Sequence, residues 1–235
     1  MKKSIFLLFA VMLTMLSATA ATYTVTQVTD NGTGATSGSL SWAINTAAAE
    51  GDVIAFNLTT GDVVTLSAAL PDIDKSLTME GINTATGNPV TIQVATPGVS
   101  TFRVFYVHFS VAGKTITLND LILRGGDVSG LTSGNEYGGV IRFFGTGLST
   151  INLSRCIIRD GKAKNGGGIN HSDGNLTINQ CTLNNNTSTS IGGGIYTSSG
   201  ASYTTVILNT TICNNSALSL GGLASSTRGA RQMSK

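Results

Sequence analysis

Short runs in which apolar and polar residues alternate recur along most of the chain, and each is bounded by Gly, Asn, Asp or Pro. Alternation with a period of two places every second side chain on one face of an extended strand. The pattern therefore predicts an all-β chain of short strands. The early runs occupy residues 23–28, 52–58, 63–66, 76–81, 90–94, 102–109 and 115–118.

From about residue 118 the runs become copies of one another. A Cys-Ile-Ile-Arg-Asp-Gly run at 156–161 precedes a Gly-Gly-Gly-Ile run, and a Cys-Thr-Leu-Asn-Asn-Asn run at 181–186 precedes another. Further copies begin at Leu121 and Thr211, which gives spacings of 35, 25 and 30 residues. Repeats of this length are too small to bury their own apolar face, so they stack as units of a solenoid.

Each repeat unit contains two apolar stretches, and a corner rich in Asn and Gly lies between them. Glycine permits positive φ and close backbone approach, and equivalent Asn side chains can hydrogen-bond one another. The copies keep one direction and one order, which favours parallel strands; antiparallel hairpins with two-residue turns are the alternative. The positions that define the repeat are Cys156, Asn165, Gly167, Gly168, Cys181, Asn184, Gly193, Gly194, Asn214, Gly221 and Gly222.

The first twenty residues are typical of an export signal. Lys2 and Lys3 precede an apolar stretch at 5–16, and Ala18 and Ala20 form a small-x-small cleavage site. We expect the mature chain to start near Ala21, and an uncleaved N-terminal anchor is the alternative. No later stretch is long and apolar enough to cross a bilayer.

The mature chain divides into three parts. Residues 21–52 are expected to form a cap, with a strand and a helix that Ser39 caps, which covers Leu40 to Ala47 and ends at Gly51; Trp42 packs over the open end. Residues 53–223 form the solenoid. Residues 224–235 lack alternation and are expected to be an unstructured tail, consistent with a truncated or frameshifted copy of a longer surface protein. A genuine short solenoid with a flexible end is the alternative.

Charge excludes two classes of partner. Only 11% of residues are charged, and loss of Lys2 and Lys3 lowers the basic count from 14 to 12, equal to the 12 acidic residues. A mature chain with no net charge has neither the basic footprint of a nucleic-acid-binding protein nor a polybasic membrane patch.

Three cysteines is an odd number for an exported chain. Cys156 and Cys181 occupy one place in adjacent repeats and should lie one above the other, packed as small apolar residues. A disulfide between them is the alternative, although parallel side-chain vectors suit that bond poorly. Cys213 is shifted by two places in its repeat.

The Cys181 to Ser188 run followed by Gly192-Gly-Gly-Ile resembles the right-handed parallel β-helix repeats of bacterial surface proteins, and chlamydial polymorphic outer-membrane proteins in particular. Those repeats pair a GGA-I/L/V motif with F-x-x-N; here Gly replaces Ala, and Cys or Thr replaces Phe. Asn184 and Asn214 match the motif's Asn, but Arg124 and Arg159 do not. The segment from Val25 to Phe56 resembles the opening of CSLREA-type β-helix proteins. The resemblance implies a single-stranded right-handed parallel β-helix, of the pectin-lyase-like kind, in a secreted or surface-displayed protein.

Exported β-helices include polysaccharide lyases and hydrolases, so we sought an active site. No acidic pair recurs at one repeat position, and we expect no catalytic residue, metal or cofactor. Weak candidates for ligand binding are Arg124, Arg159 and Lys162 on a basic edge shared with Lys164, and His171 with Asp173. We favour the alternatives, which are a solvated corner for the basic residues and a turn before Gly174 for His171 and Asp173.

The sequence predicts an exported, surface-associated or adhesin-like scaffold without enzymatic activity, located outside the cell or at a bacterial outer membrane. Its lateral face, and the loop at 126–136 in particular, would bind a glycan or a host-surface ligand. Outer-membrane association would depend on C-terminal parts missing from this chain. A polysaccharide lyase or hydrolase, complete only in a longer parent, is the alternative.

Overall fold

The computed structural model describes residues 19–46, 49–198, 203–219 and 223–225. The expected export signal, including Ala18, lies outside these residues except for Thr19 and Ala20, which precede the first strand. Gly221, Gly222 and nearly all of the expected tail also lie outside them.

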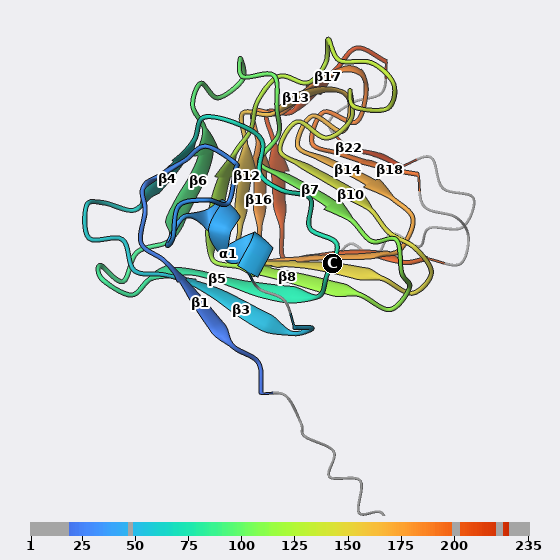
Figure 1. Cartoon of the computed structure of the whole chain (residues 1–235). Helices are drawn as coiled ribbons and strands as arrows, with labels where there is room; N and C mark the ends of the chain where they lie inside the picture. Colours follow the sequence, from blue (N-terminus) through green and yellow to red (C-terminus); the bar gives the residue numbers. More distant parts are fainter. Residues whose placement is uncertain (1–18, 47–48, 199–202, 220–222, 226–235) are drawn as a thin grey trace, which may run out of the picture.

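The described strands form four parallel sheets, which make up the sides of one solenoid (Figure 1). Sheet A contains β1 (Thr22–Val25), β3 (Asp52–Phe56), β5 (Leu77–Asn83), β8 (Thr115–Asn119), β11 (Thr150–Ser154), β15 (Asn175–Asn179) and β19 (Thr205–Leu208). Sheet B contains β2 (Thr29–Asp30), β4 (Val63–Leu66), β6 (Val90–Val94), β9 (Leu121–Arg124), β12 (Ile157–Arg159), β16 (Thr182–Asn184) and β20 (Thr211–Cys213). Sheet C contains β7 (Phe105–His108), β10 (Ile141–Phe144), β14 (Ile169–Ser172), β18 (Ile195–Thr197) and β22 (Leu223–Ser225). Sheet D contains β13 (Lys162–Asn165), β17 (Thr187–Ile191) and β21 (Ser216–Ala217).

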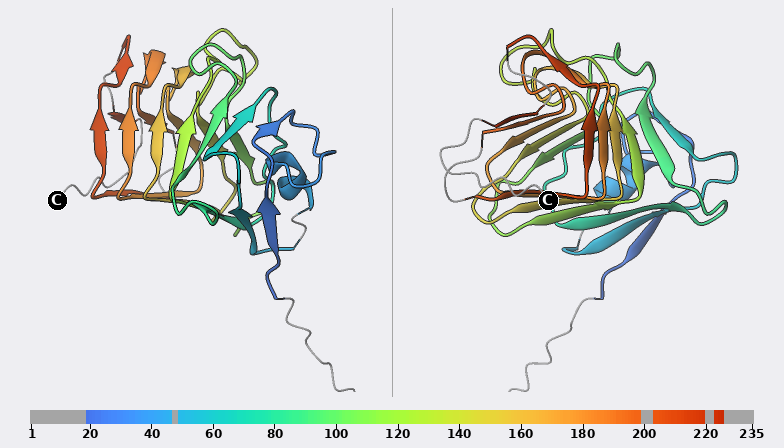
Figure 2. Two further views of the ribbon diagram at one scale, coloured as in Figure 1. Left: turned by 90° about the vertical axis from the view of Figure 1, so that its left-hand side faces the viewer. Right: turned by 180° about the vertical axis from the view of Figure 1, so that it is seen from behind.

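The chain passes from sheet to sheet in sequence order and returns to the first one coil later, through about seven coils (Figure 2). Every pairing between named strands of the described part is parallel. The predicted all-β, right-handed parallel β-helix is therefore confirmed, and the antiparallel alternative is excluded.

The core is a set of columns along the solenoid axis. In sheet A, Ile54, Met79, Leu118, Leu153 and Ile178 pair in turn across five coils, and each is at most 1% exposed. Sheet B supplies a second column, Val64, Ile92, Leu123, Ile158 and Leu183, which is equally buried. The alternation read from the sequence thus identifies the inward side chains, because the strand period fixes which face each one occupies.

The N-terminal segment does more than cap the solenoid. β1 and β2 pair with β3 and β4, so they form the first coil themselves. The helix α1 (Leu40–Thr46) follows, and the Ser39 hydroxyl accepts a hydrogen bond from the Trp42 amide at 3.2 Å, as expected for an N-cap. Trp42 packs edge-on against Tyr23. Gly51 has the expected positive φ, +87°, but it follows the last described helical residue by five positions and directly precedes β3.

Cys156 and Cys181 lie one above the other, as predicted. They are 1% and 3% exposed, both thiols are free, and the Cys156 amide donates to the Cys181 Sγ at 3.4 Å. The pair therefore fills the core as small apolar residues rather than forming a disulfide.

The alignment of the last coil was wrong by one residue. Thr182 pairs with Thr211, so Cys181 is matched by Thr210, and Asn184 is matched by the exposed Cys213 rather than by Asn214. The apolar column decides this register, because a slip of one residue would turn Ile212 out of the position that follows Leu183. At the other end of that coil, β22 continues to Ser225, two residues beyond the expected limit of the solenoid.

Glycine and asparagine build the corners in the two predicted ways. Gly138, Gly166 and Gly192 precede sheet C with φ of 66–69°. A Cβ on Gly167 would lie 2.4 Å from the Thr187 carbonyl oxygen, so only glycine fits there. The asparagine ladder runs through Asn186, which donates to Asn215 Oδ1 at 3.0 Å, and not through Asn184.

Removal of the Asn186 side chain should destabilise the fold. Its Oδ1 accepts from the Gly161 amide at 3.1 Å and its Nδ2 donates to the Ile158 carbonyl at 3.0 Å. Asn186→Ala leaves both buried groups unpaired, so we expect a loss of about 2–4 kcal/mol in the free energy of unfolding, measured by urea denaturation.

Asn184→Ala is the matched control, because the described structure gives its buried Oδ1 no partner. It should change stability by less than about 0.5 kcal/mol. Equal losses in the two variants would show that the ladder does not run through Asn186.

Candidate functional site

A cavity of about 570 Å³ opens at the edge of sheet C, where three successive coils meet. The segment after β4 contributes Leu70 and Asp72, and the approach to β7 contributes Phe102 and Arg103. The third wall is the loop between β9 and β10, through Leu131 to Ser133 and Asn135. The loop singled out from the sequence, 126–136, therefore lines this cavity, which we call the groove.

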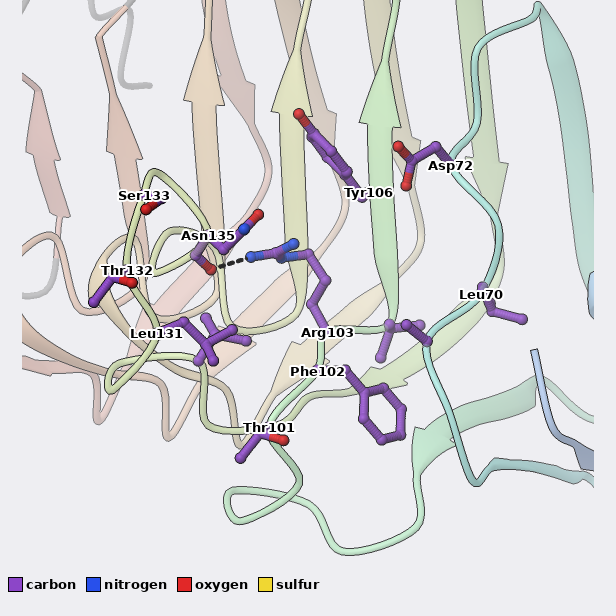
Figure 3. A pocket seen from close by; sticks show the side chains of 13 residues that line it. Leu70, Asp72, Thr101, Phe102, Arg103, Tyr106, Leu131, Thr132, Ser133 and Asn135 are labelled. Carbon is purple, nitrogen blue, oxygen red and sulfur yellow. Dashed lines mark hydrogen bonds between the residues drawn. The ribbon is translucent and has the colours of Figure 1, made fainter. Parts of the chain in front are cut away.

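Arg103 is held rigidly inside the groove. Its Nε donates to the Gly138 carbonyl at 3.1 Å, and its Nη2 donates to the Asn135 carbonyl, across the groove from the loop (Figure 3). Both acceptors are backbone atoms, so the loop fixes the guanidinium without neutralising it.

Beside the groove, the outer face of β7 and β10 carries an aromatic platform of Tyr106, His108, Arg142 and Phe144. The rings of Tyr106 and His108 are stacked with centroids 5.5 Å apart, and Phe144 meets His108 edge-on at 5.4 Å. All four side chains are half-buried. They share one face because Tyr106 pairs with Arg142 and His108 pairs with Phe144 across the two strands.

Positive charge is concentrated at the junction of the groove and the platform. The guanidinium carbons of Arg103 and Arg142 lie 5.5 Å and 4.8 Å from the centroid of the Tyr106 ring, and Arg142 also lies 5.7 Å from that of Tyr137. Burial, and then the charge of Arg142, lower the pKa of Arg103 to about 10. Arg103 is still charged at neutral pH. Its guanidinium is partly shielded from water and lies near the positive charge of Arg142.

The basic edge expected from the sequence lies elsewhere, on sheets B and D, and its charges are paired. Arg124 donates to Asp160 at 2.9 Å, and Arg159 lies 3.9 Å from the same carboxylate. Lys162 bonds Asp127 at 2.7 Å, and Lys164 lies 3.7 Å from Glu136. The structure brings these residues together, but as a neutralised network.

His171 and Asp173 do not face each other as a side-chain pair. His171 points into the core at 0% exposure and stacks on Phe143, whereas Asp173 lies in the turn before Gly174 with φ of 57°. His171 Nε2 donates to the Gly174 carbonyl at 2.9 Å, which leaves Nδ1 to accept from the Thr197 hydroxyl at 2.9 Å. Burial lowers the pKa of His171 to about 4, so the ring is neutral at physiological pH.

Sequence reasoning missed the residues that matter most in the groove, Asp72, Arg103 and Tyr106, and Arg142 on the platform. Tyr106 and Arg142 occupy outward positions of alternating strands, which is a usable signal. Asp72 and Arg103 lie in irregular segments outside the named strands, where no periodicity assigns a face.

Within the described ranges there is no group of three His, Cys, Asp or Glu side chains placed to hold a metal ion. The same ranges contain no helix with the length and apolar character needed to span a membrane. In comparisons with known proteins, the chain matches no family model, no curated protein and no solved structure.

The buried His171 should make stability depend on pH. Its pKa is about 4 in the folded state against 6.5 ordinarily, so the unfolded chain binds the proton first as the pH falls. Stability contributed by the neutral ring is complete above pH 6.5 and is lost progressively towards pH 4. Between pH 7 and pH 4.5 we expect this residue to account for about 2–3 kcal/mol of lost stability.

The measurement is the urea midpoint at both pH values for the wild type and His171→Phe, which should be less sensitive to acid by that amount. His108→Phe, on the outer face, is the control and should retain the wild-type acid loss. An identical acid loss in His171→Phe and the wild type would contradict the assignment.

Proposed function

We propose that this chain is an exported, surface-associated β-helix scaffold that binds a glycan in the groove and on the aromatic platform, without turning it over. The observation that carries the proposal is the continuity of these two features. Tyr106 lines the groove and belongs to the platform, so one extended ligand can contact both.

The shape of the site supports an extended ligand. Strands of sheet C repeat about every 4.8 Å, so the outward side chains form regular rungs along the solenoid. Tyr106 and Arg142 occupy adjacent rungs as half-buried side chains, and the half-buried Tyr196 lies two rungs further on, beyond the buried Asn170. This spacing suits a linear polymer that runs parallel to the solenoid axis.

The chemistry of the site supports a sugar. Aromatic rings present flat apolar faces against which the C–H faces of sugar rings pack, and Tyr adds a hydroxyl. The groove supplies hydroxyl and amide groups from Thr101, Thr132, Ser133 and Asn135 beside these rings. A concave site that combines apolar surface with a few polar groups is typical of small-molecule and oligosaccharide binding.

Binding is favoured over hydrolysis or elimination by the lining of the groove. Glycoside hydrolysis generally uses two carboxyl groups at a set separation, whereas Asp72 is the one carboxylate that lines the groove in the described part. The alternative, a β-helix polysaccharide lyase or hydrolase, predicts cleavage and is tested in the same experiment.

The mature protein should bind one class of oligosaccharide on a glycan array without shortening it, with or without Ca²⁺. Tyr106→Ala should weaken binding about tenfold, because it removes the ring shared by the groove and the platform. Tyr106→Phe retains the ring and should stay within about threefold of the wild type. Release of new reducing or unsaturated ends would refute a binding-only role, and absence of any glycan ligand would refute the proposed function.

Export should be visible in the mass of the mature chain. Expressed with its own N-terminus in a bacterium that has an outer membrane, the protein should leave the cytoplasm and begin near Ala21. Ala18→Lys combined with Ala20→Lys should block processing and leave the full-length chain in the membrane fraction. A full-length chain that stays in the cytoplasm would contradict export.

A further inference from the structure

Two arginines differ from every other arginine in the described part of the chain. Arg124, Arg155 and Arg159 each lie within 4.0 Å of a carboxylate. Arg103 and Arg142 have no such partner among the described residues, although they are half-buried and adjacent. The other arginines of the described residues therefore contact a carboxylate, whereas Arg103 has only the more distant charge of Asp72.

We propose that Arg103 and Arg142 form a subsite for the carboxylate of an acidic sugar unit, so that the glycan bound by this scaffold is a uronate-containing polymer. This inference rests on the proposed function and specifies its ligand. The role assigned to Arg103, on the wall of the groove, and to Arg142, on the platform, is binding. No chemical step is involved.

Geometry supports a carboxylate in particular. The Arg103 guanidinium is anchored through Nε and Nη2, and its Nη1 has no hydrogen-bond partner in the described part of the structure. The Arg142 guanidinium carbon lies near the rings of Tyr106 and Tyr137, and no hydrogen bond or ion pair occupies its N–H donors in the described part of the structure. Arginine donors of this kind match the two oxygens of a carboxylate, and charge-assisted bonds are about twice as strong as neutral ones.

Electrostatics points the same way. Two cations that share one aromatic ring repel each other, and partial burial removes part of the water that would screen them. A ligand anion bound between the two guanidinium groups would offset both their mutual repulsion and their loss of water. Asp72 lies on the opposite wall of the groove (Figure 3) and is within 4.0 Å of neither arginine, so it does not occupy this place itself.

The test compares an oligogalacturonate of defined length with its fully methyl-esterified form, which keeps the sugar rings and removes the charges. By isothermal titration calorimetry, the wild type should bind the acid at least about tenfold more tightly than the ester, with an affinity that falls as salt rises. Arg142→Gln should remove most of that preference, because it weakens binding of the acid much more than binding of the ester.

Arg155→Gln is the matched control. It removes the same charge from an exposed arginine paired with Asp120 on the corner between sheets A and B, so the preference for the acid should persist. Asp72→Asn should strengthen binding of the acid, because it removes a like charge from the groove. Arg142 is the preferred test position, since Arg103 also holds the loop through two backbone carbonyls.

The outcomes separate this inference from the proposed function. Equal affinity for acid and ester, unchanged in Arg142→Gln, overturns the carboxylate subsite and leaves glycan binding intact. A sulfated oligosaccharide that binds while the uronate does not also overturns it. If neither galacturonate form nor any other glycan binds, the proposed function fails as well.

Discussion

The structure depends on the stacking of like side chains in register between successive coils. Ile54, Met79, Leu118, Leu153 and Ile178 form one buried column, and each coil completes the apolar surface that its neighbour leaves open. No single coil has a core of its own, so each is stable only within the stack. The glycines and asparagines at the corners serve this constraint, because they let the chain turn and the backbones approach without shifting the register. The same stacking brings outward residues of different coils onto one face, which is how the groove and the platform arise.

Much of the fold could be predicted from the sequence, because strand alternation is a local signal. It identified the inward side chains and the stacked cysteines, and the repeat gave the parallel arrangement. The error in the last coil has a clear cause. The sequence alignment matched Asn214 with Asn184 and Thr211 with Cys181 by their place in the polar motif, whereas the pairing of Leu183 with Ile212 fixes the true register. The register of the strands is predicted more reliably from residues that face the core than from residues of the corner, because the corner tolerates substitution.

The site was less predictable, because it is assembled from turns. Asp72, Arg103 and Asn135 come from three coils, and only the stacking places them around one cavity. The charged residues that stood out in the sequence, Arg124 and Arg159, lie on a regular sheet where a carboxylate neutralises them. The clustered charges of this repeat form ion pairs, whereas Arg103 and Arg142 lie beside the loop that interrupts the repeat. The loop at 126–136 was recognised because its length breaks the repeat.

The stacking itself can be measured as a distance. Val53 and Thr177 point outward from sheet A and are four rungs apart, through Thr78, Thr117 and Asn152. Spin labels on Val53→Cys and Thr177→Cys, in a Cys213→Ser background, should give a single narrow distance near 19 Å by double electron–electron resonance, from four steps of about 4.8 Å. A broad distribution, or a distance well above 30 Å, would contradict the in-register stack.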